Sequence, residues 1–452
     1  MSGAPLARRS LHFIGIGGAG MSGLALVARV LGARVGGSDN ADTPYLDRVR
    51  AGGIEPVIGY DAANLPPEAE VVVSTAIADD NPELVAARAA GASILHRGEL
   101  LREVASFKRT IAVAGTHGKT TTCAMAAHAL LACGRDPGYL IGGQLRSTGA
   151  NAAWGEGEWV VVEADESDGS FLRLRPEVAV VTNVELDHHA NYRALSELEA
   201  AFGEFTSCAA VRVLGEGVDL PGSGQVVSFG IGRGQLRAEH LELQPLGARF
   251  DVEGVSVQLK VPGRHNVLNA LAALAACRVA GVQPAEAAPA LATFGGTARR
   301  FEGRGRTPSG ALVFDDYAHH PTEVRATLEA ARTLGASRIV ACFQPHLFSR
   351  TRELAREFGR ALAVADLVVV LDVYPARERA EDFPGVTGLL VAAAAADAAH
   401  GRRVWWLPTM DQAEHMLRGE LREGDVLLTL GAGDVDRVAA RIAVPDPEGD
   451  LR

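Results

Sequence analysis

The chain has 452 residues, of which 47% are hydrophobic and 22% charged, a balance typical of a globular protein with about three domains. Its net charge of −11 argues against a general nucleic-acid-binding surface. The five cysteines form no CxxC pair and no apolar stretch is long enough to cross a bilayer, so we expect a reduced, cytoplasmic protein without disulfides, zinc or membrane insertion.

The first 106 residues alternate between strand-like and helix-like segments. Strand-like runs at 11–16, 33–39 and 70–77 precede helical patterns at 21–32, 43–53 and 81–91. Continuous apolar strands separated by helices are typical of a parallel sheet with both faces covered. The sequence therefore predicts an α/β domain over residues 1–106.

A glycine-rich turn joins the first predicted strand to the first helix. Gly15, Gly17 and Gly20 form a GxGxxG pattern, and glycines there let the backbone approach a pyrophosphate. Asp39 lies about 20 residues further on, where an acidic residue often contacts a ribose. The pattern favours a nucleotide site over a structural turn, without deciding between NAD and another nucleotide.

A second domain is predicted over residues 107–297. Buried strands are expected at 109–115, 159–165 and 178–184. Between about 215 and 261 glycine is frequent and the apolar runs are shorter. Alternating segments such as 250–261 indicate antiparallel strands. A helix is expected at 265–281.

The strand at 109–114 leads into a candidate phosphate-binding loop, Gly115-Thr116-His117-Gly118-Lys119-Thr120-Thr121. In such loops the amides point inward, the lysine supplies a cation for the β- and γ-phosphates, and the following hydroxyl binds Mg²⁺. Val113 occupies the position where the usual pattern has its first glycine, so we expect a variant loop. We also expect Lys119 to lie on an exposed turn.

Two further strand ends carry candidate metal ligands. Glu163 ends a buried strand, where parallel sheets place ligand groups, and is assigned to Mg²⁺. The acidic residues that follow it, Asp165, Glu166 and Asp168, are interpreted as a solvated loop. His188 follows the strand at 178–184 and is a weaker candidate on chemistry alone, because Mg²⁺ prefers oxygen ligands.

The helix at 265–281 begins with His265, Asn266 and Asn269. The two asparagines lie on one face, and their amides suit an adenine edge. Capping of the helix by Asn266 is an equally good explanation.

A Gly- and Arg-rich segment at 294–306 marks a boundary, and a third α/β domain is predicted over residues 298–452. Its strands are expected at 311–317, 338–343, 366–374, 404–408 and 425–434, with helices beginning at Pro321 and Arg350. Acids, histidines and arginine follow two of these strands, which predicts a site.

Seven motifs occur in order along the chain: GTHGKTTT, EADESDGSF, TNVELDHH, GRHNVLNALAA, RRFE, DDYAHHPTE and FQPHLFSRT. Together they resemble the Mur ligase family, from about Leu11 to Val444. The resemblance implies three domains: an N-terminal Rossmann-like domain for a UDP-sugar, a central P-loop ATPase-like sheet with an antiparallel extension for ATP, and a C-terminal Rossmann-like domain for an amino acid.

The resemblance also implies roles for individual residues. Catalysis falls to Lys119, His346 and Arg350. ATP is bound by Gly115, Thr116, His117, Gly118, Lys119, Thr120, Thr121, His265, Asn266, Asn269 and Asp316, and Mg²⁺ by Thr120, Glu163 and His188. The other substrates are bound by Gly17, Gly18, Gly20, Ser38, Asp39, Ser74, Arg300, Tyr317, His319, His346 and Arg350.

The implied reaction is the ATP-dependent, ADP-forming ligation of L-alanine to the carboxylate of UDP-N-acetylmuramate, through an acyl phosphate, in peptidoglycan precursor synthesis. The alternative is attachment of a recycled tripeptide to the same sugar nucleotide. Tripeptide ligases typically carry EPRSNT where this chain has FQPHLFSRT, which favours L-alanine. We expect a monomer or a weak homodimer.

Two positions depart from the family pattern: Ala190 replaces a usual aspartate and Leu347 a usual arginine. Two other classes of protein fit the sequence less well. A nicotinamide dehydrogenase would explain the glycine-rich turn and Asp39 but would not need Lys119 and Glu163. A non-catalytic homologue would be expected to lack these two residues, which are both present.

Overall fold

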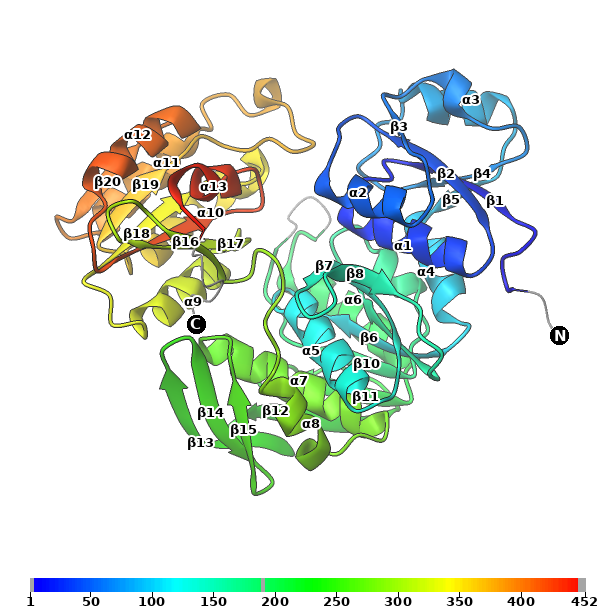
Figure 1. The fold of residues 1–452 in the computed structure, drawn as a ribbon, viewed down its shortest axis with the longest axis horizontal. Coiled ribbons are helices and arrows are strands. Elements are labelled where there is room, and N and C mark those ends of the chain that lie inside the picture. Colours follow the sequence, from blue (N-terminus) through cyan, green and yellow to red (C-terminus); the bar gives the residue numbers. More distant parts are fainter. Residues whose placement is uncertain (1–3, 188–191, 446–452) are drawn as a thin grey trace. The chain divides into compact units, whose positions relative to one another are not determined.

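The computed structural model describes residues 4–187 and 192–445 (Figure 1). The chain divides into two compact units. The first contains Met1–Val184, Leu195–Leu236 and Asn269–Ala290, and the second contains Glu185–Ala194, Arg237–Leu268 and Leu291–Arg452.

The first unit contains a parallel sheet with the strand order β3-β2-β1-β4-β5. Its strands are β1 (Ser10–Ile14), β2 (Arg34–Asp39), β3 (Val57–Ile58), β4 (Glu70–Val73) and β5 (Ile94–His96). Its helices are α1 (Ala19–Val30), α2 (Pro44–Ala51), α3 (Pro82–Ala89) and α4 (Arg97–Ala105), with a 3₁₀ turn η1 (Ala62–Asn64). Phe13, Ile14, Val71 and Val72 are fully buried, as expected for central strands covered on both faces.

The same unit contains a second sheet with the order β12-β11-β10-β6-β9-β7-β8, in which only the pair β7–β8 is antiparallel. Its strands are β6 (Arg109–Ala114), β7 (Gly138–Leu145), β8 (Ala150–Ala153), β9 (Trp159–Glu163), β10 (Val178–Val181), β11 (Val211–Gly215) and β12 (Gln225–Ile231). The helical segments are α5 (Lys119–Ala132), η2 (Ser170–Arg173), α6 (Leu195–Ser207), α7 (Arg264–Val279) and α8 (Pro284–Leu291). Helix α5 is buried at every position from Thr120 to Leu130, as expected for a helix without a polar face.

The antiparallel strands predicted near 250–261 are confirmed. β14 (Gly247–Val252) pairs with both β13 (Leu236–Gln244) and β15 (Val255–Leu259).

The second unit also contains a sheet with the order β16-β17-β21-β18-β19-β20, parallel except for β16. Its strands are β16 (Glu302–Arg306), β17 (Leu312–Asp316), β18 (Arg338–Phe343), β19 (Leu367–Val370), β20 (Arg403–Trp406) and β21 (Asp425–Leu430). Its helical segments are α9 (Pro321–Arg332), α10 (Phe348–Leu362), η3 (Ala380–Asp382), α11 (Gly388–Ala398), α12 (Met410–Glu420) and α13 (Asp436–Ile442). Ile339 and Ala341 of β18 pack in one apolar cluster and Val340 and Cys342 in another, so both faces of this sheet are covered.

The α/β architecture agrees with the sequence prediction, although α10 begins at Phe348, two residues before the predicted Arg350. All five cysteines are free. No helix in the described ranges is long and apolar enough to cross a membrane. The domain limits at 106 and 297 stay predictions.

Candidate active site

The phosphate loop lies between β6 and α5, and its two glycines have left-handed backbone angles, with φ of 130° at Gly115 and 82° at Gly118. A side chain at Gly118 would overlap the amide oxygen of Asn269, and one at Gly115 would overlap the hydroxyl of Thr182. Glycine is therefore required at both positions by conformation and by space.

Lys119 is nearly enclosed, with only 13% of its side chain exposed. Its Nζ donates to the carbonyl oxygens of Gly115 (2.8 Å) and Thr116 (3.3 Å) and to Glu166 Oε1 (2.8 Å). Burial would lower the pKa of Lys119, but the carboxylates of Glu166 and Asp165 outweigh it and raise the pKa, so the ammonium stays charged. The expectation of an exposed lysine is wrong, because the loop folds back on Glu166.

Glu163 ends β9 beside the phosphate loop. Its Oε1 accepts from the Thr120 hydroxyl at 3.0 Å and its Oε2 from the Gly142 amide at 2.7 Å. Burial raises the pKa of Glu163, an effect that Lys119 partly offsets. A partly buried carboxylate beside a hydroxyl offers the oxygen ligands that Mg²⁺ prefers. His188, the third predicted metal ligand, lies outside the described residues, as does Ala190.

The acidic residues after Glu163 do not form the solvated loop that we expected. The Glu166 side chain has no exposed surface and that of Asp168 is 6% exposed. Arg97 Nη2 donates to Asp165 Oδ2 (3.1 Å) and Asp168 Oδ2 (2.9 Å). Burial alone would raise the pKa of Asp165, yet Lys119 and Arg97 bring it down to about 2. The interpretation is wrong because two cations enclose these carboxylates.

The predicted sugar-nucleotide residues gather at the carboxyl ends of β1, β2 and β4. The Gly17 amide donates to Asp39 Oδ2 at 2.8 Å, and a side chain at Gly17 would lie 2.9 Å from the same oxygen. Gly18 precedes α1 and Gly20 lies in its first turn. Asp39 therefore fixes the glycine-rich turn directly.

Two predicted serines differ in their surroundings. Ser38 Oγ donates to Glu83 Oε2 at 2.6 Å, and both residues are fully buried. The hydroxyl of Ser38 thus points at a protein carboxylate. Ser74 follows β4, and its Oγ accepts from the Ala76 amide at 3.4 Å.

Near the start of α7, Asn266 and Asn269 are buried and His265 is half-buried. Asn269 Oδ1 accepts from the Thr122 hydroxyl at 3.3 Å beside Gly118, so this amide is packed against the phosphate loop. Asn266 Nδ2 donates to the Pro262 carbonyl oxygen at 2.7 Å. Burial lowers the pKa of His265 to about 4.

In the second unit, an aromatic group that we call the histidine cluster consists of Tyr317, His319, His346 and Tyr374. Successive ring centroids lie 5.4, 6.0 and 5.8 Å apart. Burial lowers the pKa of His319 to about 4 and that of His346 to about 3, so both imidazoles are neutral at pH 7.

Asp316 and Arg300 lie next to this cluster. Asp316, at the end of β17, accepts from the amides of Phe301 and Ala318, each at 2.8 Å, and burial raises its pKa to about 6. The Arg300 guanidinium lies 5.3 Å from the centroid of the Tyr317 ring, a cation–π distance.

Arg350 is 5% exposed and bound to Asp187. Its Nε and Nη2 donate to the two carboxylate oxygens of Asp187, each at 3.1 Å, and its Nη1 lies 3.3 Å from His346 Nδ1. The helix that carries Arg350 begins after Leu347, whose φ of 70° is unusual for a leucine. Leu347 is buried, so the departure from the family pattern places an apolar side chain here.

Sequence reasoning missed Arg97 and Glu83, and gave no task to Glu166 and Asp187. Arg97 belongs to no recognisable sequence motif. Glu166 and Asp187, in contrast, each follow the end of a buried strand, and this position could have identified them as candidate site residues.

Comparison with known proteins agrees with this geometry. Three family models match: "Mur ligase family, catalytic domain" over residues 10–109, "Mur ligase middle domain" over 113–277 and "Mur ligase, glutamate ligase domain" over 299–433. UDP-N-acetylmuramate–L-alanine ligase of Streptomyces coelicolor is 45% identical over 97% of this chain and 98% of its own.

Solved structures give the same result. UDP-N-acetylmuramate-alanine ligase of Thermotoga maritima is similar with a TM-score of 0.83 and 32% identity, covering 96% of this chain and 98% of that one. A murein peptide ligase of Psychrobacter arcticus has a TM-score of 0.72 and 25% identity over the same shares. With an intact phosphate loop and end-to-end similarity, the chain belongs to the Mur ligase family.

Proposed function

We propose that this enzyme joins L-alanine to the carboxylate of UDP-N-acetylmuramate while ATP becomes ADP and phosphate. The observation that carries the proposal is the phosphate loop, where a charged Lys119 lies beside the Thr120–Glu163 pair. Relatives 44–46% identical over nearly the whole chain bear this activity in their names, which supports the choice of substrates. The free cysteines are compatible with a cytoplasmic location.

In the first step, a carboxylate oxygen of the sugar nucleotide forms a bond to the γ-phosphorus of ATP, and the bond to the ADP oxygen breaks. The products are ADP and an acyl phosphate. Lys119 Nζ offsets negative charge on the transferring group, which is the main task of a protein in phosphoryl transfer. To do so, Lys119 shares its charge between Glu166 and the phosphates.

In the second step, the neutral amine of L-alanine forms a bond to the acyl carbon, and the bond from that carbon to the phosphate oxygen breaks. The departing phosphate takes the proton that the amine loses. Arg350 keeps Nε and Nη2 on Asp187, which leaves Nη1, beside His346, for the carboxylate of L-alanine. Neutral His319 and His346 add no positive charge that would repel an incoming ammonium.

Mg²⁺ fits the residues around the phosphate loop. Four carboxylates, those of Glu163, Asp165, Glu166 and Asp168, face the two cations Lys119 and Arg97, so four negative and two positive charges leave −2. One divalent cation would balance this charge. Thr120 and Glu163, together with the sequence-predicted His188, would hold Mg²⁺, which supplies charge neutralisation for phosphoryl transfer.

The second candidate is ligation of a tripeptide, because the Psychrobacter arcticus murein peptide ligase is similar over 96% of the chain. The test is phosphate release by the purified enzyme with UDP-N-acetylmuramate, ATP and Mg²⁺, adding each amino acid or L-alanyl-γ-D-glutamyl-meso-diaminopimelate singly. We expect release with L-alanine. Release with the tripeptide alone would establish the second candidate instead.

A further inference from the structure

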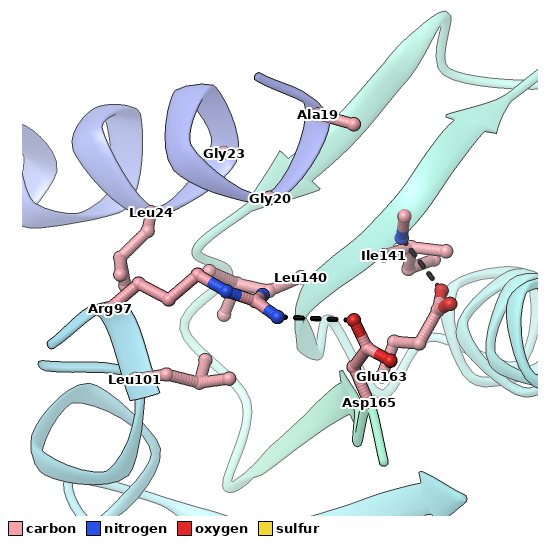
Figure 2. Close-up of a pocket in the computed structure, with 11 residues that line it drawn as sticks. Ala19, Gly20, Gly23, Leu24, Arg97, Leu101, Leu140, Ile141, Glu163 and Asp165 are labelled. Atoms are coloured by element: carbon pink, nitrogen blue, oxygen red, sulfur yellow. Dashed lines mark hydrogen bonds and ion pairs between the residues drawn. The ribbon is translucent and has the colours of Figure 1, made fainter. Parts of the chain in front are cut away.

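A cavity of about 200 Å³ lies within the first unit, between helices α1 and α4 and strand β7 (Figure 2). Leu24, Leu101 and Leu140 form its apolar wall, and Arg97, Glu163 and Asp165 bring charged groups to it. Pockets for whole drug-sized ligands usually measure about 300–1,000 Å³. This cavity therefore suits part of a sugar nucleotide rather than the whole molecule.

Arg97 is the first residue of α4, and only one nitrogen of its guanidinium is hydrogen-bonded within the described residues. Nη2 makes both hydrogen bonds, to Asp165 and Asp168, as Figure 2 shows for Asp165. Within residues 4–187 and 192–445, Nε and Nη1 make no hydrogen bond. The guanidinium is thus oriented by two carboxylates and retains donors for a ligand.

The free side of Arg97 faces the first turn of α1. A Cβ placed on Gly20 would lie only 3.3 Å from Nη1, so glycine leaves this nitrogen its space. On the opposite side of the cavity stands Glu163, which contacts Thr120 of the phosphate loop. The cavity therefore extends from the glycine-rich turn to the place where phosphoryl transfer is proposed.

A guanidinium with free N–H groups in a partly apolar cavity offers an oxyanion charge-assisted and forked hydrogen bonds, which strengthen where water is scarce. We propose that Arg97 binds an oxyanion of the sugar nucleotide, either its diphosphate or its muramyl carboxylate, while Asp165 and Asp168 hold the guanidinium in place. This inference rests on the proposed function. It assigns Asp165 and Asp168, in the acidic segment after Glu163, the role of orienting Arg97.

The test compares the wild-type enzyme with Arg97→Lys by calorimetric titration of UDP-N-acetylmuramate, UDP-N-acetylglucosamine and a non-hydrolysable ATP analogue. Lysine keeps the charge but cannot make the forked contact. We expect affinity for UDP-N-acetylmuramate to fall on the order of 10- to 100-fold, and affinity for the ATP analogue to change less than about twofold. The matched control is Arg173→Lys, because Arg173 pairs with Glu99 of the same helix but is 45% exposed.

UDP-N-acetylglucosamine has the diphosphate but lacks the carboxylate. An equal loss of affinity for both sugar nucleotides assigns Arg97 to the diphosphate, and a loss confined to UDP-N-acetylmuramate assigns it to the carboxylate. Unchanged affinity for both would overturn the inference. A wild-type enzyme that binds neither sugar nucleotide would instead refute the proposed function.

A second variant guards against a merely structural effect. Asp168→Asn removes one of the carboxylates that orient Arg97 and keeps the guanidinium. We expect a smaller loss, of about 3- to 10-fold, again for the sugar nucleotide and not for the ATP analogue. Equal losses for both ligands in both variants, with a lowered unfolding temperature, would show that Arg97 only stabilises the fold.

Discussion

Around the phosphate loop, partly buried carboxylates face partly buried cations, and Lys119 and Arg97 lower the pKa of Asp165 to about 2 against the effect of burial. The histidine cluster of the second unit is equally buried but nearly uncharged, because burial lowers the pKa of His319 and His346 to about 4 and about 3. The first region is suited to a cation and phosphates. The second is suited to keeping one arginine, Arg350, fixed on Asp187. One chain therefore uses two ways to tolerate burial of titratable groups: pairing and neutralisation.

The largest effect is expected from removing the cation of the phosphate loop. Lys119→Met should lower kcat by about 10³-fold or more, because charge stabilisation at the transferring phosphoryl group is lost. It should also cost about 3 kcal/mol of unfolding free energy, because Glu166 is left buried without its cation. Phosphate release and urea unfolding measure the two losses.

The double variant Lys119→Met/Glu166→Gln separates these roles. Removing the orphaned charge should restore most of the stability and none of the activity. Near-normal turnover by a folded Lys119→Met enzyme would refute the assignment of the loop.

The histidine cluster, together with His265, should make the enzyme sensitive to acid. His265, His319 and His346 have lowered pKa values of about 4, about 4 and about 3, so below pH 6.5 the unfolded chain binds more protons than the folded one. Their stabilisation is complete above pH 6.5 and is lost as pH falls toward 4. Burial raises the pKa of Asp316 from 3.8 to about 6, so the folded chain binds its proton more tightly than the unfolded chain does. As the pH falls below about 6, Asp316 therefore adds stability and offsets part of the loss caused by the histidines.

We expect a net loss of about 3 kcal/mol between pH 7 and pH 5, measured by urea unfolding. His319→Asn should reduce this dependence on pH. Equal stability at pH 7 and pH 5 in the wild-type enzyme would contradict the neutral cluster.

Metal dependence should follow Glu163. Glu163→Gln keeps the shape but removes the charge beside Thr120, and should raise the Mg²⁺ concentration for half-maximal activity about 10- to 100-fold. The control is Glu158→Gln, since Glu158 is exposed just before the other end of the same strand. If His188 binds the same metal ion, the rise in Mg²⁺ requirement of the double variant Glu163→Gln/His188→Ala should differ from the sum of the two single effects on a free-energy scale. An unchanged Mg²⁺ requirement in Glu163→Gln would count against this site.

The smallest effect is expected at Arg350. Arg350→Lys should raise KM for L-alanine about 10-fold and change KM for ATP less than about twofold, because lysine cannot hold Asp187 and a substrate carboxylate together. Asp187→Asn should reproduce part of this change if Arg350 depends on its partner. Arg352→Lys, on an exposed position of the same helix, serves as the control. A rise in KM confined to ATP would assign Arg350 to phosphate.

The sequence was most informative where function depends on neighbouring residues. The loop Gly115–Thr121 and the end of β9 at Glu163 could be read directly, because strand, turn and helix follow one another along the chain. The alternation of buried strands and helices also predicted the parallel strands of all three α/β sheets, but not the antiparallel pairs β7–β8 and β16–β17.

The remaining features depend on contacts distant in sequence. Arg97 meets Asp165 and Asp168 across 68 and 71 residues, and Arg350 meets Asp187 across 163. An acidic run looks solvated until the fold places cations against it, which explains the misreading of Glu166. Burial of His319 and His346 likewise follows from tertiary packing and not from their local motif.

The most direct test of the central claim follows one oxygen atom. UDP-N-acetylmuramate labelled with oxygen-18 in its carboxylate is incubated with enzyme, ATP, Mg²⁺ and L-alanine, and the released phosphate is analysed by mass spectrometry. If the carboxylate attacks the γ-phosphate to form an acyl phosphate, one labelled oxygen appears in each phosphate released during ligation. Phosphate without the label, with oxygen taken from solvent water instead, would contradict the acyl-phosphate route and the role given to the phosphate loop.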